Sequence, residues 1–599
     1  MIYHCEDHTC NYWDEGEKLP ERCPQCGRKL LRANEADMTG DDWTALGNTL
    51  WYAEASDKKR MVDCFRKAAY LGSAWGVCNL GICMEQGNGV EADPVQAFWL
   101  YQQAVEMGSL NAVCCLGVCY QYGIGTAPDA KQAAELYCKA AEYGSPRGQM
   151  LLARAFHDGI GVEADAAEAM HWVRAAAYQR YGEGMHRLGV CYAYGDGVEQ
   201  NWEHAVHWFR EAAESGVSVA MADLGYCYEK GCGVEQSWEQ AFSWYRRGAE
   251  CGYPVSMSNL GLCYKRGYGV DQNWQEAIKW YEQGAQCGDL QSMHNLARCY
   301  ERGEGVEQNE ERALYWYRRS AEGGNGSAMC NLGRCYKRGY GVEQNWQEAV
   351  KWYEQGAQCG NLQSMHNLAC CYEHGEGVEQ NMTEAIRWYT AAAEGGNADA
   401  MHNLGWHYDH GEGVEQDMKK AICWYERAAE QNHPAAMNSL GECYAMGRGV
   451  PRDLETAMEW YRRAAELGEA MADYNMGWHL EQAGKLSEAY AHYRKAADGN
   501  DDSAWWALGR FYENGVVVAQ DGKEARRCYE TGEKLGSVKC KMRLARCKLL
   551  GIGGRREKKA GLDLCRQALE LAKESSEKED YGYEAEMNLL RRTIAENES

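Results

Sequence analysis

The chain has 599 residues, of which 45% are hydrophobic and 25% charged, so it can bury a large core and is neither disordered nor fibrous. Its 88 acidic and 63 basic side chains give a net charge of -25, which argues against generic binding to nucleic acid or to a membrane surface. No apolar run has the length of a membrane span and the first residues lack the character of a signal peptide, so we expect a cytoplasmic protein.

The first expected module, residues 1–35, has cysteines spaced as metal ligands. Cys5 and Cys10 form one close pair, and Cys23 and Cys26 form a second within Cys-Pro-Gln-Cys-Gly. Two such pairs separated by a loop are the arrangement that a tetrahedral zinc site needs. We expect these four cysteines to bind one structural zinc ion, with His8 as an alternative to Cys10. So short a segment buries little core, so the metal would supply its folding free energy.

The second cysteine pair, with Leu19-Pro20 before it, resembles the knuckles of the zinc-ribbon and rubredoxin-like families. The first pair departs from the Cys-x2-Cys spacing of both families. This departure argues against a redox iron site. The rubredoxin-like resemblance still leaves one alternative interpretation, a redox protein in which the knuckle binds iron and the rest of the chain is a docking arm. Nucleic-acid binding by this module is disfavoured, because the loop between the pairs is acidic.

Residues 36–555 are expected to form a second domain, because they are an internal repeat. The dipeptide Leu-Gly, or a close variant, recurs every 36 residues from Leu80 to Met476. Looser copies at Leu46, Leu508 and Leu544 bring the number of copies to about fifteen. A fixed period of this size indicates one supersecondary unit that is stacked many times.

One unit, residues 256–288, shows why the repeat is predicted to be a helical hairpin. Leu260 and Tyr264 lie at helical spacing, and Gly267 is suited to the left-handed end of a first helix. Asn273 is a typical N-cap for a second helix, which carries Tyr281 on its apolar side. The predicted fold class is therefore all-α.

The pattern Ala-x3-Leu-Gly-x2-Tyr-x2-Gly-x-Gly-Val, followed by Ala-x2-Trp-Tyr-x2-Ala-Ala, is seen at Ala400–Ala429 and resembles the Sel-one-like repeat, a relative of the tetratricopeptide repeat. The resemblance covers most of the chain. It implies a right-handed α-solenoid that acts as a scaffold or adaptor for proteins or peptides, usually without catalysis. Beyond it, in residues 556–599, Lys559–Lys573 and Tyr583–Ala595 are predicted to be capping helices.

Other recurring residues are interpreted as structural. Cysteine recurs three residues after the leucine of the repeat, where it is expected to pack in the core as a small apolar residue. The Gly-x-Gly pairs follow predicted helices rather than strands, so they indicate turns and not phosphate-binding loops. No catalytic motif is present, so we expect that the protein is not an enzyme.

The candidate binding residues come from the positions expected to face the concave surface, which lie 2 residues before and 2, 5 and 6 residues after the repeat leucine. In the central units these positions carry ten cations and histidines: Lys265, Arg266, His294, Arg298, Arg302, Arg334, Lys337, Arg338, His366 and His402. Such a stripe could receive an acidic or carboxylate-bearing protein or peptide through arginine fork contacts. The alternative is a solvated face whose charge is balanced by Glu229, Glu301 and Glu373.

A tandem duplication offers an internal comparison for this stripe. Asn259–Asn309 and Asn331–Asn381 are identical except at six positions. Two of these differences remove an arginine of the stripe from the second copy, where Cys370 and His374 replace Arg298 and Arg302. The first copy is therefore predicted to matter more for binding than the second.

Overall fold

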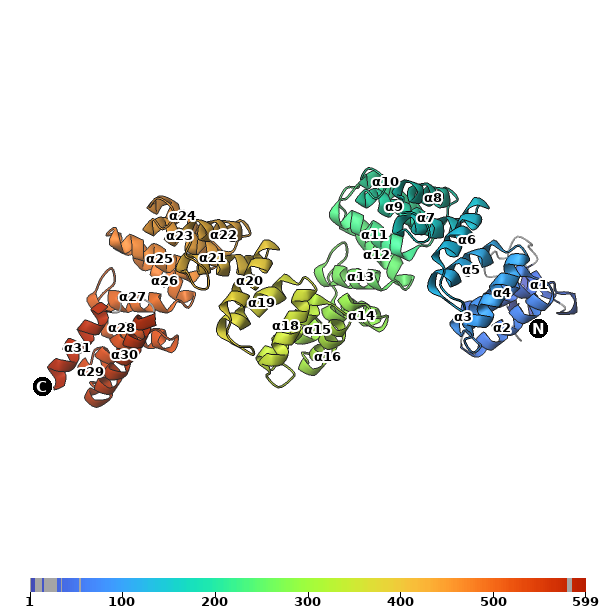
Figure 1. Cartoon of the computed structure of the whole chain (residues 1–599). Helices are drawn as coiled ribbons and strands as arrows, with labels where there is room; N and C mark the ends of the chain where they lie inside the picture. The colour runs from blue at the N-terminus through green and yellow to red at the C-terminus, as the bar shows by residue number, and fades with distance from the viewer. Residues whose placement is uncertain are drawn as a thin grey trace. The chain divides into compact units, whose positions relative to one another are not determined.

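The computed structural model of the chain describes residues 2–5, 13–15, 30–33, 35–52, 55–578 and 584–598. The chain falls into two compact units, Met1–Gln308 and Asn309–Ser599, and each is taken on its own below. A small sheet opens the first unit, and helices make up the rest of both (Figure 1).

The sheet has three antiparallel strands in the order β2-β1-β3. Strand β1 (Ile2–Cys5) pairs with β2 (Trp13–Glu15), Tyr3 lying opposite Asp14, and with β3 (Leu30–Ala33), Cys5 lying opposite Leu30. The short 3-10 helices η1 (Glu35–Asp37) and η2 (Leu50–Tyr52) flank the first α-helix.

The first unit contains seven helical hairpins and one further helix. The first helices are α1 (Gly40–Thr49), α3 (Ala74–Gln86), α5 (Leu110–Tyr122), α7 (Pro146–Asp158), α9 (Gly182–Tyr194), α11 (Ser218–Lys230) and α13 (Pro254–Arg266). The second helices are α2 (Ala55–Tyr70), α4 (Pro94–Glu106), α6 (Ala130–Glu142), α8 (Ala166–Tyr178), α10 (Trp202–Glu214), α12 (Trp238–Glu250) and α14 (Trp274–Gln286). Helix α15 (Leu290–Arg302) closes the unit.

The second unit opens with α16 (Glu310–Glu322) and continues with seven hairpins. Their first helices are α17 (Gly326–Arg338), α19 (Leu362–His374), α21 (Ala398–His410), α23 (Pro434–Met446), α25 (Ala470–Gln482), α27 (Asp502–Asn514) and α29 (Val538–Leu550). Their second helices are α18 (Trp346–Gln358), α20 (Met382–Glu394), α22 (Met418–Glu430), α24 (Leu454–Glu466), α26 (Leu486–Asp498), α28 (Gly522–Lys534) and α30 (Lys558–Lys578), and α31 (Glu584–Glu598) follows. The predicted repeat of helical hairpins is confirmed.

The turn inside each hairpin depends on glycine and on side-chain caps. Gly267 and Gly269 both have left-handed φ angles, +74° and +68°, and a Cβ on Gly269 would lie 2.2 Å from the carbonyl oxygen of Trp238. Asn273 then caps α14, because its side chain accepts a hydrogen bond from the N–H of Glu276 at 3.1 Å. Gln272 donates to the carbonyl oxygen of Lys265 at 2.7 Å and so satisfies the end of α13.

The core of most hairpins is a glycine-on-aromatic contact. An added Cβ on Gly261 of α13 would lie 2.5 Å from the ring of Tyr281 on α14, and Gly225 meets Tyr245 in the same way at 2.6 Å. These tyrosines are among the largest fully buried side chains. The repeat cysteines beside them, such as Cys263, are also buried, which confirms their predicted role in the core.

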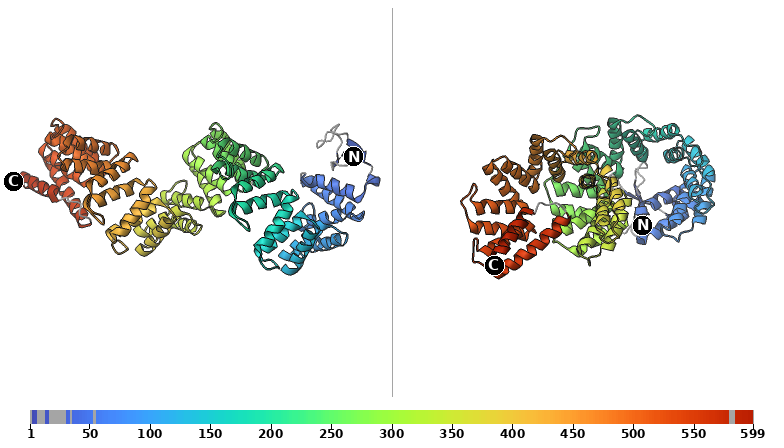
Figure 2. Two further views of the ribbon diagram at one scale, coloured as in Figure 1. Left: turned by 90° about the horizontal axis from the view of Figure 1, so that it is seen from above. Right: turned by 60° about the vertical axis from the view of Figure 1, so that its left-hand side comes forward.

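Successive hairpins stack in chain order within each unit, and the further views show the same order (Figure 2). Within the described helices, close approaches recur between successive first helices, such as α11 with α13 and α17 with α19, more than between successive second helices. The first helices are therefore the more tightly packed layer of each unit.

The end of the second unit differs from the sequence prediction. Helix α30, which includes the expected capping segment Lys559–Lys573, pairs with α29 as the second helix of a hairpin. Its Cys565 and Ala568 share one apolar cluster with Leu549 of α29, so the boundary expected at residue 555 falls inside this hairpin. Helix α31 packs on both helices and adds Leu590 to the cluster.

Candidate functional site

The predicted metal ligands lie mostly outside the described residues. This holds for Cys10, Cys23, Cys26 and the alternative ligand His8, whereas Cys5 is the last residue of β1. Within the residues that are described, no group of three or more His, Cys, Asp or Glu side chains could hold a metal ion. The zinc site therefore stays a prediction from the sequence.

The histidines of the predicted stripe lie between neighbouring first helices rather than on an open face. His294 is buried. His366 is half-buried and its Nε2 lies 3.3 Å from the side-chain amide of Asn403, on the next first helix. His402 is half-buried too, 3.4 Å from the hydroxyl of Ser439 on the helix after that. The position two residues before the leucine thus faces the neighbouring repeat, which the helical periodicity of a single unit does not reveal.

The two lysines of the stripe bridge successive repeats. Lys265 has a side chain only 12% exposed and lies 2.9 Å from Glu304, in the Gly-x-Gly turn of the next repeat. Lys337 makes the same contact with Glu376 at 3.7 Å. Burial alone would raise the pKa of Glu304, but the hydrogen bond and charge of Lys265 outweigh it and hold that pKa below its ordinary value. These two cations are therefore largely neutralised within the chain.

The arginines of the stripe differ in exposure and in their ion pairs. Arg266 and Arg302 in the first unit and Arg338 in the second are exposed, and Arg298 and Arg334 are half-buried. Arg302 lies 3.6 Å from Glu304. Neither Arg266 nor Arg298 has an ion-pair partner among the described residues. The charges of both arginines act on the phenol of Tyr281 and favour a lower pKa of that group.

The tyrosine hydroxyls of the hairpins follow a common rule. In several hairpins the second-helix tyrosine donates a hydrogen bond to an acidic side chain sixteen residues earlier, near the end of the first helix. The pairs and distances are Tyr101 with Glu85 at 2.6 Å, Tyr245 with Glu229 at 2.9 Å, Tyr389 with Glu373 at 2.5 Å and Tyr529 with Glu513 at 2.8 Å. The hydrogen bond satisfies a hydroxyl that would otherwise be buried without an acceptor.

Tyr281 breaks this rule. The residue sixteen positions before it is Lys265, which turns to Glu304 instead. The hydroxyl of Tyr281 is buried and has no hydrogen-bond partner. Burial raises the pKa of this phenol, and the charges of Arg298 and Arg266 act in the opposite direction. A carboxylate that reached this hydroxyl would satisfy a donor that the described residues leave without an acceptor.

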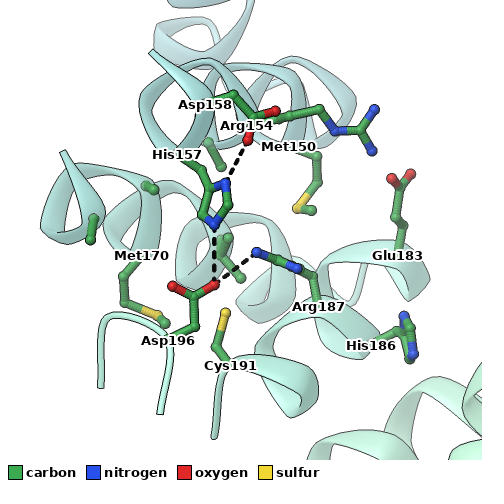
Figure 3. Close-up of a pocket in the computed structure, with 14 residues that line it drawn as sticks. Met150, Arg154, His157, Asp158, Met170, Glu183, His186, Arg187, Cys191 and Asp196 are labelled. Atoms are coloured by element: carbon green, nitrogen blue, oxygen red, sulfur yellow. Dashed lines mark hydrogen bonds and ion pairs between the residues drawn. The ribbon is translucent and has the colours of Figure 1, made fainter. Parts of the chain in front are cut away.

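A cavity of about 320 Å³ lies elsewhere in the first unit, between α7, α8 and α9 (Figure 3). Its inner wall includes Ala153, Val173 and Cys191, all of them buried. At its rim the guanidinium of Arg187 lies 2.8 Å from Asp196, and His157 lies 2.6 Å from Asp158 (Figure 3). Burial raises the pKa of the Cys191 thiol, so it lines the cavity as a neutral group.

Sequence reasoning missed both Val173 and the partnerless hydroxyl of Tyr281. Part of the signal was nevertheless present: Val173 interrupts a column of aromatic residues in the aligned repeats, and Lys265 stands where the two flanking repeats have Glu229 and Glu301. Their meaning depends on contacts between the two helices of a hairpin. Only the three-dimensional arrangement supplies these contacts.

The described helices include none that is both long and apolar enough to cross a membrane. Among curated proteins, none matches the chain. Among solved structures, a protective antigen present in uropathogenic Escherichia coli strains, displaying an SLR fold, is 32% identical, with a TM-score of 0.51, over 75% of this chain and 97% of the antigen. A Sel1 repeat protein from Oxalobacter formigenes is also 32% identical, with a TM-score of 0.37, over 41% of this chain and 96% of that protein.

The model of the Sel1 repeat matches fourteen segments that run almost without a break from residue 76 to residue 573. The matched segments are 76–109, 112–145, 146–181, 182–217, 218–253, 254–289, 290–325, 326–361, 362–397, 398–433, 434–469, 470–501, 504–537 and 538–573. They coincide with the hairpins from α3–α4 onward, including α29–α30. The chain therefore belongs to the Sel1 repeat family.

Proposed function

We propose that the protein is a non-catalytic scaffold that binds an acidic segment of a protein or peptide at the first helices of its solenoid. Sel1 repeat solenoids are typical of protein–protein interaction scaffolds. The observation that supports the acidic specificity is the hydroxyl of Tyr281, which is buried without an acceptor and on which the charges of Arg266 and Arg298 act. A ligand carboxylate would take the place of the glutamate that other hairpins supply themselves.

The energetics favour a ligand with several contacts. An exposed ion pair contributes only about 0–1 kcal/mol, whereas a hydrogen bond to a charged group contributes about 1.5–3 kcal/mol. A hydrogen bond from the Tyr281 hydroxyl should contribute more binding free energy than an ion pair with either arginine. The free chain already bears the desolvation cost of burying this hydroxyl without an acceptor. Affinity should fall with added salt, since the arginines are near the surface.

Selection from a randomised peptide library on the full-length chain tests this proposal. We expect peptides rich in Asp and Glu, and we expect the double substitution Arg266→Ala with Arg298→Ala to abolish their capture. The control is Arg246→Ala with Arg462→Ala, which removes two exposed arginines of second helices that pair with neighbouring glutamates. Unchanged capture by the first double variant would refute the site.

The duplicated block sharpens the same experiment. Arg338 and Cys370 occupy the places of Arg266 and Arg298 in the second copy. We therefore expect Arg338→Ala to weaken capture less than Arg266→Ala does. The other residues predicted for the stripe, Arg302, Arg334 and Lys337, are proposed to add only long-range attraction.

We also propose that residues 1–35 bind one structural zinc ion through Cys5, Cys10, Cys23 and Cys26, supported by the spacing of these cysteines. Metal analysis of the purified chain should give one zinc per chain, and Cys23→Ser with Cys26→Ser should remove it while helical content is kept. Iron in place of zinc would favour the redox alternative. The proposed place of action is the cytoplasm, where the many cysteines would stay reduced.

A further inference from the structure

The cavity between α7, α8 and α9 arises from one break in the repeat. In the first unit the residue that packs against the repeat glycine is aromatic in the other six hairpins: Phe65, Tyr101, Tyr137, Phe209, Tyr245 and Tyr281. In the α7–α8 hairpin this residue is Val173, which is 4% exposed. A valine fills much less of the space between two helices than a phenol ring does. The hairpin therefore lacks the ring that its neighbours bury.

The space left behind fits an aromatic ring supplied from outside. The cavity measures about 320 Å³, at the small end of the range for ligand pockets and large enough for one aromatic side chain. Ala153 faces Val173 where most hairpins have glycine, yet in the second unit the equivalent pair Ala369 and Tyr389 is fully buried. An alanine at this position thus leaves room for a ring.

The rim of the cavity supplies one unpaired cation. Arg154 is exposed and, among the described residues, has no ion-pair partner. The other charged groups of the rim are engaged. Arg187 pairs with Asp196 at 2.8 Å, and His186 with Asp223 at 2.6 Å. His157 pairs with Asp158 at 2.6 Å, and the carboxylate of Glu183 accepts a hydrogen bond from the hydroxyl of Tyr181 at 3.3 Å. Figure 3 shows the guanidinium of Arg154 pointing away from Arg187 and Asp196.

We propose that this cavity binds a phenylalanine or tyrosine side chain of the partner protein, with an adjacent carboxylate held by Arg154. The proposal extends the proposed function, on which it rests, by naming a second recognition site for the same kind of acidic segment. The ring would restore the contact that Val173 lacks, and the carboxylate would pair with the one rim cation that is not neutralised within the chain.

N-acetylphenylalanine, which combines the ring with a carboxylate, is the probe for this site. Ligand-observed NMR with the full-length chain should detect its binding, and N-acetylphenylalanine amide and N-acetylleucine should bind more weakly. Val173→Phe fills the cavity with the chain's own ring, so it should reduce probe affinity by about tenfold or more and raise the melting temperature. Arg154→Ala should lower affinity for the acid to that for the amide and leave the amide unaffected.

A second filling variant, Ala153→Leu, guards against a local folding defect in Val173→Phe, and hydrogen exchange over α7–α9 verifies that each variant is folded. No binding of the probe to the native chain, or equal binding to a folded filling variant, would overturn the proposal. The double substitution Arg266→Ala with Arg298→Ala should not affect probe binding. A failure at this cavity is therefore distinguishable from a failure of the Tyr281 site.

Discussion

The neighbouring hairpins α11–α12 and α13–α14 are built on the same core and differ in how it is completed. Each buries a tyrosine against a glycine of the first helix, Tyr245 on Gly225 and Tyr281 on Gly261. In the first hairpin the hydroxyl donates to Glu229 at 2.9 Å, so the hydrogen bond is closed within the hairpin. In the second the corresponding residue is Lys265, and the hydroxyl has no partner.

The difference separates what the fold needs from what it leaves variable. The glycine and the tyrosine ring set the distance between the two helices. The residue that accepts the hydrogen bond from the hydroxyl can change as long as the loss of folding stability is small. A buried donor without an acceptor costs stability, and the proposed ligand would supply the acceptor that Tyr281 lacks. The following predictions test the two halves of this comparison.

The largest loss of stability should come from disrupting the glycine–tyrosine contact that the two hairpins share. Gly225→Val and Gly261→Val each place methyl groups where a Cβ alone would already lie 2.6 Å and 2.5 Å from a tyrosine ring. Overpacking of this kind should cost about 3 kcal/mol in each hairpin. Hydrogen exchange measured locally is the appropriate readout, because a long repeat array does not unfold in one step. If only one of the two substitutions lowered the local stability of its hairpin, the two cores would not be equivalent.

Removing the two hydroxyls should have unequal effects. Tyr245→Phe deprives Glu229 of its hydrogen bond and should destabilise α11–α12 by about 2 kcal/mol. Tyr281→Phe removes a hydroxyl that has no partner, so the stability of α13–α14 should change by less than about 0.5 kcal/mol. The opening free energies of α12 and α14 from hydrogen exchange provide the measurement. Equal losses in both variants would show that Tyr281 has an acceptor in solution.

A comparison of the first helices α13 and α21 predicts that the stability of α21 depends on pH. Where α13 has the buried Ser258, α21 has His402, whose pKa is lowered from 6.5 to about 4 by burial and by the charge of His433. Between these two values the unfolded chain binds more protons than the folded one, so acidification destabilises α21. At pH 5.5 the loss relative to neutral pH should be about 1 kcal/mol.

The groups around His402 define the control for this measurement. Its ring stacks on His433 at 5.2 Å, and His433 lies 3.2 Å from Asp399, whose pKa is lowered and which therefore titrates below this window. Burial lowers the pKa of His366 as well, so part of the pH dependence should remain in His402→Asn. Hydrogen exchange of α21 at neutral pH and at pH 5.5 should show a reduced loss in that variant. An unreduced loss would place the titration elsewhere.

A small gain in stability should come from converting one hairpin into the other. Lys265→Glu with Glu304→Tyr gives α13–α14 the residues that Glu229 and Tyr268 provide in the preceding repeat. The new hydrogen bond from Tyr281 should outweigh the lost ion pair and raise local stability by less than about 1 kcal/mol. Thermal melting and hydrogen exchange measure the change. A loss of stability would contradict the proposed equivalence of the two hairpins.

The fold was largely predictable because each repeat contains residues that mark where its helices begin and end. The 36-residue period, the glycines that end each first helix and the N-cap residues together predict a hairpin, and the structure has hairpins at those places. The end was less predictable, because the polar surface of α30 resembles a cap although Cys565 and Ala568 pack as in any other hairpin.

The candidate site was predictable only in part. Arg266 and Arg298 were predicted from their place in the repeat and are exposed and half-buried, and their role in binding stays a prediction. His294, His366 and His402 were expected on an open face but lie between first helices. The periodicity of one helix identifies its apolar side and says nothing about the neighbour that covers another side. The missing acceptor of Tyr281 requires knowledge of which residues meet across a hairpin, and the cavity at Val173 requires knowledge of what the ring would have filled.

The affinity of a selected acidic peptide for Tyr281→Phe tests the central claim most directly. If the peptide carboxylate accepts a hydrogen bond from this hydroxyl, affinity should fall by about tenfold while the stability of α13–α14 is unchanged. Tyr245→Phe is the matched control, and it should lose stability without losing affinity. Equal affinity of the native chain and folded Tyr281→Phe would contradict the account, because the hydroxyl would then have no role in recognising the ligand.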